Sequence, residues 1–186
     1  VRELGGKPFL TDCNTLYPGS RKNALEHLEC AWENGFTPLT AGCPILIGDG
    51  LKGTDDVEVP VEGGEYVKEA RIGRAVMDAD VFISLSHFKG HEAAGFGGAI
   101  KNIGMGCGSR AGKCEPHNNG KPTIDRERCR GCRRCQRECA NEGLVFDEAS
   151  KKMTVDREHC LGCGRCLGAC NFDAIHFTES NAVEIF

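Results

Sequence analysis

The chain has 186 residues, with 23 Lys and Arg against 27 Asp and Glu, and a formal net charge of −4. This mild acidity argues against a general nucleic-acid-binding protein, and no uncharged apolar run is long enough to predict a membrane span. Because 13 cysteines occur without the pattern of an export signal, the composition favours a reducing cytoplasm, where such cysteines bind metal or do redox chemistry.

The first 113 residues predict alternating strands and helices. We expect strands at 7–12, 44–50 and 81–87, helices at 21–36 and 66–80, and a weak hairpin edge within 55–66. This order predicts an α/β domain with a parallel sheet, whose ligand site lies where the strands end, after residue 85. Because the chain starts at Val1, in a stretch that resembles the end of a helix or the approach to a strand, we expect this domain to be incomplete.

A linker and a cysteine-rich module complete the predicted organisation, which is α+β overall. Residues 114–124 contain Pro, Asn and Gly without periodicity and are expected to be the linker, and 125–186 form the module. Within the module, DRERCRGCRRCQRECANEGLVF (125–146) aligns without a gap on DREHCLGCGRCLGACNFDAIHF (156–177), 31 positions later. The alignment predicts an internal repeat of one structural unit.

Each half of the repeat carries the spacing Cys-x2-Cys-x2-Cys-x3-Cys. Three cysteines at i, i+3 and i+6 wrap a loop around a small body, and the fourth follows too soon to close the same cage. The module resembles bacterial-type two-cluster ferredoxins, in which the fourth cysteine of each run binds the other cluster. The resemblance implies two [4Fe–4S] clusters. The implied ligands are Cys129, Cys132, Cys135 and Cys170 for cluster one, and Cys160, Cys163, Cys166 and Cys139 for cluster two.

Two details qualify this resemblance. Gly131 and Gly162 fit it, since the loop backbone must come close to inorganic sulfide. Ala140 and Asn171 stand where the family usually has Pro, which leaves the ligands in place and changes the entry to the following helix. The alternatives are zinc and disulfides, but zinc prefers four ligands from two well-separated pairs, and two runs of four cysteines fit that poorly.

Arginine is concentrated in the first half of the repeat. One interpretation is a solvated loop face. The other is that positive charge raises the reduction potential of cluster one above that of cluster two and docks an acidic redox partner protein. The six residues concerned are Arg126, Arg128, Arg130, Arg133, Arg134 and Arg137.

The stretch SLSHFKGHEAAGFGGAIKNIGMGCGSRAGK (84–113) holds a second candidate site. This stretch, followed by the module, resembles the family called domain of unknown function 362, and the resemblance covers nearly the whole chain. His87, His91 and Lys101 are candidates for catalysis, and the two histidines could bind a metal or transfer protons near neutral pH. Gly97 and Gly98 precede an expected helix, and free N–H groups there, with Lys101, could bind an anion or cofactor. The alternative is that these residues only cap strands and face solvent.

Three functions remain open. The first is an electron carrier, in which the module passes single electrons between partners and the α/β domain docks one of them. The second is an oxidoreductase, in which a substrate or cofactor binds near His87, His91 and Lys101 and the clusters supply electrons. The third is a scaffold whose clusters only stabilise the fold. Outside the module, Cys107 and Cys114 could form a further metal site with a histidine, although small buried thiols are the more common arrangement.

Overall fold

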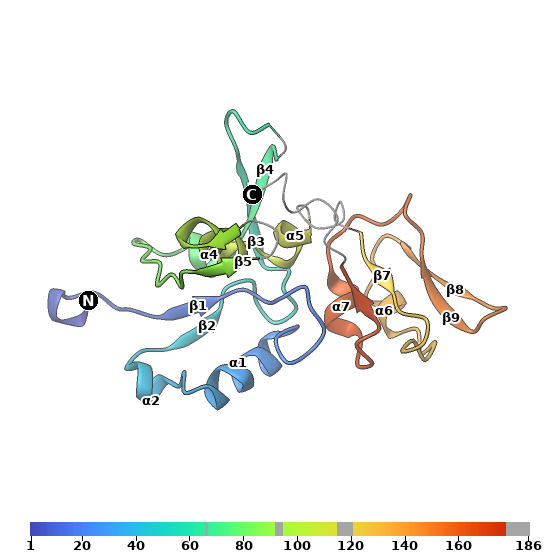
Figure 1. The fold of residues 1–186 in the computed structure, drawn as a ribbon, viewed down its shortest axis with the longest axis horizontal. Helices are drawn as coiled ribbons and strands as arrows, with labels where there is room; N and C mark the ends of the chain where they lie inside the picture. The colour runs from blue at the N-terminus through green and yellow to red at the C-terminus, as the bar shows by residue number, and fades with distance from the viewer. Residues whose placement is uncertain (66, 92–94, 115–120, 178–186) are drawn as a thin grey trace.

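The computed structural model describes residues 1–65, 67–91, 95–114 and 121–177. Most of the expected linker, residues 92–94 of the second candidate site and the last nine positions of the module therefore lie outside the described residues. Figure 1 shows the N-terminal half at one side of the molecule and the module at the other, with α7 facing the N-terminal half and the β8–β9 hairpin at the far end.

The described chain is a mixture of short helices and two-stranded sheets, which confirms the α+β class. The elements of the N-terminal half, in chain order, are a 3-10 turn Arg2–Leu4, β1 Leu10–Asp12, α1 Ala24–Glu33, α2 Pro38–Ala41, β2 Ile45–Ile47, β3 Asp56–Pro60, β4 Glu69–Gly73, α3 Arg74–Met77, β5 Lys89–His91, β6 Gly95–Gly97, α4 Ala99–Cys107 and α5 Arg110–Cys114. The elements of the module are β7 Thr123–Ile124, α6 Arg134–Arg137, β8 Leu144–Asp147, β9 Lys152–Val155, α7 Arg165–Ala169 and β10 Ile175–His176.

Several predicted elements of the N-terminal half are confirmed. The strands expected at 7–12 and 44–50 appear as β1 and β2, which pair in parallel. The helix expected at 21–36 appears as α1, and it starts where the side chain of Asn23 accepts hydrogen bonds from the N–H groups of Leu25 and Glu26, both at 3.1 Å. The other described strand pairs are antiparallel, so parallel pairing in this part of the chain is limited to β1 and β2.

Two predicted elements are wrong. Of the described residues in the helix expected at 66–80, only Arg74–Met77 are helical, as α3, whereas Glu69–Gly73 form strand β4, which pairs along its whole length with β3. Ala70 and Ile72, two positions apart, lie on the same face of the sheet opposite Val59 and Val57, and this cross-strand pairing outweighs the helical spacing of the apolar residues. The strand expected at 81–87 is an irregular, mostly exposed segment.

The backbone of the module repeats as its sequence does. Strand β7 before the first cysteine run pairs with β10 after the second, through Ile124↔Ile175, while β9 pairs with β8 through Val155↔Leu144. These two pairs correspond to each other 31 positions apart. Each half thus lends a strand to the other half. Strand β7 lies at the end of the segment expected to be the linker.

The repeat extends to individual backbone conformations. Three pairs of corresponding positions have positive φ, namely Gly131 (62°) and Gly162 (71°), Arg133 (60°) and Gly164 (69°), and Glu142 (56°) and Asp173 (49°). Helices α6 and α7 begin immediately after the second of these pairs. The same local fold therefore shapes both cysteine loops.

The main hydrophobic core lies in the module and takes in two residues of the N-terminal half. Leu16 and Cys114 are 2% and 0% exposed and belong to the same buried cluster as Met153, Leu167 and Ile175. The two halves therefore share apolar burial, which favours their association. In the part of the chain that the structure describes, none of the helices has the length and apolar character needed to cross a membrane.

Candidate metal centres

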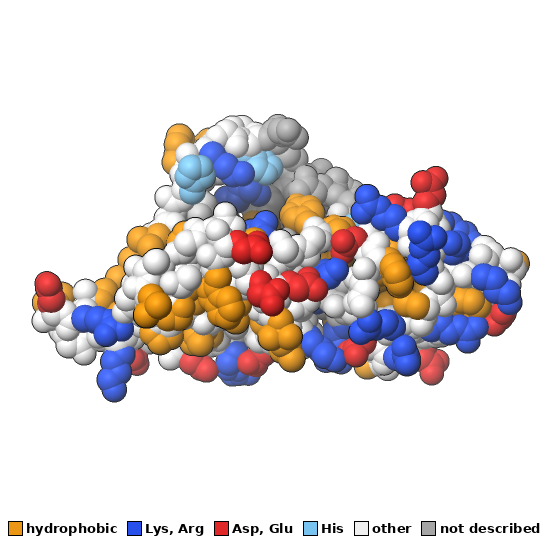
Figure 2. Space-filling model, turned by 90° about the horizontal axis from the view of Figure 1, so that it is seen from below, with side chains coloured by type: hydrophobic (Ala, Val, Ile, Leu, Met, Phe, Trp, Pro, Cys, Tyr) orange, Lys and Arg blue, Asp and Glu red, His pale blue; other side chains and the backbone are white. Residues whose placement is uncertain are grey.

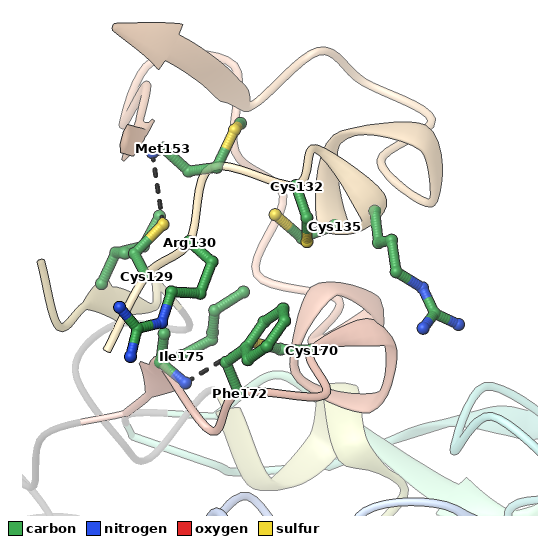
Figure 3. A pocket seen from close by; sticks show the side chains of 11 residues that line it. Cys129, Arg130, Cys132, Cys135, Met153, Cys170, Phe172 and Ile175 are labelled. Carbon is green, nitrogen blue, oxygen red and sulfur yellow. Dashed lines mark hydrogen bonds between the residues drawn. The ribbon is translucent and has the colours of Figure 1, made fainter. Parts of the chain in front are cut away.

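The first cysteine-lined cavity lies at the loop that leads into α6. Its wall contains Cys129, Cys132 and Cys135 from the first run and Cys170 from the end of the second. Figure 3 shows these four side chains around the cavity, with Cys170 coming from α7 on the opposite side to Cys132 and Cys135. These are the four residues that the ferredoxin resemblance implies for cluster one.

The second cavity is the counterpart of the first. Its wall contains Cys160, Cys163 and Cys166 from the second run and Cys139 from the end of the first. These are the four residues implied for cluster two. In both cavities three cysteines come from one run and one comes from the other, an exchange that follows from the strand exchange between the two halves.

The thirteen cysteines, all within the described residues, are free thiols. Among those residues, no three Cys, His, Asp or Glu side chains converge closely enough to hold a single metal ion. The four thiols of each set line a cavity instead. Thiols around a small cavity are the donor set that an iron–sulfur cluster uses.

The surroundings of the thiols also fit a bound cluster. The backbone N–H of Met153 donates to Cys129 Sγ at 3.5 Å, and the N–H of Ala174 donates to Cys170 Sγ at 3.4 Å. Burial raises the pKa of Cys135 to about 11, with the neighbouring Cys170 adding to the shift, and burial likewise raises the pKa of Cys166. The two N–H groups would stabilise negative charge on the sulfur atoms that they contact, as thiolate ligands require.

Arg110 anchors the second cavity to the N-terminal half. Its guanidinium is fully buried, and Nη1 donates to the carbonyl oxygens of Lys52 at 2.9 Å and Gly164 at 3.3 Å, while Nη2 donates to the carbonyl of Lys22. Gly164 directly follows Cys163. One side chain of α5 thus joins the second cysteine loop to two loops of the N-terminal half.

Two lysines extend this contact. Lys22 Nζ donates to the carbonyl of Cys170 at 3.0 Å and forms a 2.6 Å ion pair with Asp173. Lys52 Nζ pairs with Glu138 at 2.7 Å, but both of these side chains are more than one third exposed. The buried Lys22 contact is therefore the stronger of the two.

A buried polar cluster lies behind Arg110. The N–H and side-chain amide of Asn14 donate to Asp49 Oδ1 at 2.9 and 2.8 Å, and Lys113 Nζ donates to the carbonyls of Cys13 and Asn14 at 2.9 and 2.7 Å. Burial raises the pKa of Asp49, an effect that the Asn14 N–H, Lys113 and Arg110 oppose. Burial lowers the pKa of Lys113, while Cys13, Asp12 and Asp49 oppose that shift.

Sequence reasoning missed Arg110, Lys22 and this cluster. Lys22 and Asp173 are 151 positions apart, so no local pattern connects them. The signal that was available is a difference within the repeat, where Arg133 in the first half corresponds to Gly164 in the second. The structure places Arg110 against Gly164, where a side chain would not fit.

The second candidate site forms around β5, β6 and α4. Helix α4 starts after Gly98, as expected, and the side chain of Lys101 lies over Gly97, where a Cβ would be 3.2 Å from Lys101 Cδ. Asn102 holds the backbone of His87: its amide nitrogen donates to the carbonyl at 3.2 Å and its oxygen accepts from the N–H at 3.3 Å. His91 pairs with Gly95 in the β5–β6 hairpin. His87 is exposed and His91 half-buried.

The other chemical candidates take different positions. Cys13 Sγ lies 3.5 Å from the carbonyl oxygen of Cys107, on the Lys113 side, whereas Cys114 is buried against the second cysteine loop beside Gly164. Of the six arginines in the first loop, three pair with carboxylates of the module: Arg126 with Asp147, Arg128 with Asp125, and Arg133 with Glu148. Figure 2 shows Lys and Arg side chains gathered over the module end of one face.

The fold and the cavities define an α+β protein with two sets of four thiols. The chain belongs to the family described as domain of unknown function (DUF362), whose model matches residues 1–181. No curated protein and no solved structure matches the chain.

Proposed function

We propose that this chain carries single electrons through two [4Fe–4S] clusters to or from a partner protein. The observation that carries the proposal is the composition of the two cavities. Each is lined by three cysteines of one run and the last cysteine of the other. That exchange is the ligand pattern of two-cluster ferredoxins, so we propose a ferredoxin-like fold for the module.

The eight cysteines would form two separate sets of cluster ligands. Cys129, Cys132, Cys135 and Cys170 would hold one cluster, and Cys139, Cys160, Cys163 and Cys166 the other. When bound, each cluster takes up one electron and gives it up again, without a change in covalent bonds to a substrate. The N–H groups of Met153 and Ala174 would stabilise negative charge on Cys129 and Cys170.

The two cavities differ in their exposure to solvent. Cys132, in the first cavity, is exposed, whereas the loop of the second cavity contacts the N-terminal half through Gly164. We propose that electrons enter or leave from the partner protein at the first cavity. The exposed arginines Arg130 and Arg134 line that cavity and would favour an acidic docking face on the partner. The proposed compartment is the reducing cytoplasm.

Iron and acid-labile sulfide analysis of protein purified without oxygen tests this proposal. We expect about eight iron and about eight sulfide atoms per chain, because each cubane holds four of each. Reduction should produce the electron paramagnetic resonance spectrum of interacting [4Fe–4S]⁺ centres. Stoichiometric zinc without sulfide, or clusters that no reductant can reduce, would overturn the proposal.

A second candidate function is an oxidoreductase with its substrate at β5, β6 and α4. The observation that favours it is that only Gly108 and Ser109 separate the end of α4 from α5, whose Arg110 contacts the second cysteine loop. The second cavity is thus connected by a short stretch of chain to Lys101 and the His87 backbone. Replacing His91 with Ala tests this function: loss of turnover with full iron content supports an enzyme, and unchanged electron transfer supports a carrier.

A further inference from the structure

Arg110 fills the space next to Gly164, the position in the second half of the repeat that corresponds to Arg133 in the first half. In the first half of the repeat, Arg133 adopts positive φ, pairs with Glu148 at 3.0 Å and covers the ring of Phe146 at 3.7 Å. In the second half, a Cβ on Gly164 would lie 2.5 Å from Cγ and Cδ of Arg110. The second loop therefore needs glycine because a side chain from α5 already fills the space.

A second glycine close to the second cysteine loop, Gly168, also lies against Arg110. A Cβ on Gly168 would lie 2.7 Å from Arg110 Nη1 and 3.3 Å from the carbonyl oxygen of Lys22. Gly164 and Gly168 bracket Cys166, one of the four cysteines of the second cavity. The guanidinium is thus held against the backbone that carries two of the cavity thiols, Cys163 and Cys166.

The charge on Arg110 is permanent and poorly screened. A guanidinium keeps its proton in proteins, and Arg110 is fully buried. Burial lowers the pKa of Arg110, and the groups that oppose this shift are Asp49 and the thiols of Cys114, Cys166 and Cys163. Because Nη1 donates to the carbonyl of Gly164, the residue after Cys163, and lies against Gly168, the guanidinium is close to the backbone of Cys163 and Cys166 in surroundings of low dielectric constant.

The buried charges behind Arg110 do not cancel it. Asp49 is the buried carboxylate of the cluster, and its Oδ1 accepts from Asn14. Lys113 is a second buried cation, held by the carbonyls of Cys13 and Asn14. Lys22, the third buried cation, is paired with Asp173 at 2.6 Å, so Arg110 and Lys113 with Asp49 leave net positive charge on this side of the second cavity.

We infer that Arg110 is a positioning residue that raises the reduction potential of the site lined by Cys139, Cys160, Cys163 and Cys166 above that of the other site. The inference rests on the proposed function. An electron that arrives at this site adds one negative charge, and the fixed guanidinium stabilises it. Electrons therefore settle at the end of the path that contacts the N-terminal half.

This inference opposes the expectation that the arginines of the first loop raise cluster one. All six arginines of the first loop, including Arg130 and Arg134 at the first cavity, are exposed, and three of them pair with carboxylates: Arg126, Arg128 and Arg133. Water and salt screen exposed charges strongly, and the carboxylates offset them. One buried, unscreened guanidinium should outweigh them.

The test is a redox titration of the purified protein, followed by electron paramagnetic resonance, on Arg110→Gln, Arg110→Lys and the control Arg128→Gln. Gln keeps hydrogen-bond donors without the charge, and Lys keeps the charge. In Arg110→Gln we expect the reduced-to-oxidised ratio of one cluster to fall at least tenfold at fixed potential, about 59 mV for one electron. Arg110→Lys should keep most of the wild-type potential, and Arg128→Gln should match wild type.

The outcomes separate this inference from the proposed function. Full iron and sulfide with equal potentials in Arg110→Gln and wild type would overturn the inference alone, whereas absence of clusters from the wild-type protein would overturn the proposed function. Equal shifts in Arg110→Gln and Arg110→Lys would show a structural role and also overturn the inference.

A measurement on the wild-type protein keeps the inference testable if the Arg110 variants do not fold. The potentials of the two clusters are compared at low and high salt, and Cys139→Ser identifies which signal belongs to the second site. We expect the second site to have the higher potential and the gap to persist at high salt, because a buried charge is little screened. A gap of the opposite sign, or one that vanishes in salt, would overturn the inference.

Discussion

The ammonium group of Lys22 forms a 2.6 Å ion pair with the carboxylate of Asp173, which lies 151 positions later in the chain. The same ammonium donates to the carbonyl of Cys170. The side chain of Lys22 is only 8% exposed and that of Asp173 is 35% exposed, so the cation is buried and the carboxylate partly so. Lys22 therefore connects the loop before α1 directly to Cys170, a cysteine of the first cavity.

Replacing Lys22 with Met should destabilise the protein by about 2 kcal/mol, because a buried carbonyl and a carboxylate lose a charged donor. The matched control is Lys52→Met, which breaks the exposed ion pair with Glu138 and should cost no more than about 1 kcal/mol. Urea unfolding of both variants measures the difference. Equal costs would contradict the ranking of the two contacts.

Replacing Gly164 with Ala should cost about 2–4 kcal/mol, since positive φ strains a residue with a Cβ and the methyl group meets Arg110. Gly63→Ala is the control: Gly63 has a φ of 73°, close to the 69° of Gly164, but no atom lies within 4 Å of its Cβ position. Gly63→Ala should lose only the stability that positive φ costs a residue with a Cβ, about 1–2 kcal/mol. Thermal unfolding compares the two, and identical losses would mean that Arg110 moves aside freely.

In the proposed two-cluster protein, the last cysteine of each run should be required for the cluster that the other run holds. Cys170→Ser is expected to impair the site of Cys129, Cys132 and Cys135, and Cys139→Ser the site of Cys160, Cys163 and Cys166, with loss of about four of eight iron atoms in each case. Iron analysis and paramagnetic resonance measure the loss. Cys30→Ser, on α1, is the control and should retain all of the iron. Loss of the same signal in both cysteine variants would contradict the exchange of ligands.

Stability should fall as the pH is lowered through the titration of His27. Burial lowers the pKa of His27 below its ordinary 6.5, and Asp12, 4.0 Å away, only partly opposes the shift. The unfolded chain therefore takes up the proton first. The free energy of unfolding is at its full value above about pH 6.5, falls as the pH drops below that, and levels off below the folded-state pKa.

The comparison of wild type with His27→Gln isolates this term. The stability advantage of wild type over the variant should shrink between about pH 8 and about pH 5.5, measured by urea unfolding. A difference between wild type and His27→Gln that stays constant with pH would refute the assignment.

Local features of the fold were predictable because they depend on neighbours in the sequence. The spacing of the cysteines predicted an internal repeat, and β7–β10 with β8–β9 confirm it in the backbone. Helix α1 follows from apolar spacing and the Asn23 cap. Strand β4 was predicted as a helix because residues 66–80 also satisfy a helical period, and only its register with β3 decides between the two.

The sequence by itself determined that eight cysteines form two equivalent runs, since their spacing and the glycines between them are local properties of the chain. Only the tertiary structure decided what surrounds them. It brought the guanidinium of Arg110 against Gly164 and the ammonium of Lys22 against Asp173, pairs separated by 54 and 151 positions. Such contacts follow from how α5 and the loop before α1 meet α7, and no periodicity in the sequence encodes that meeting.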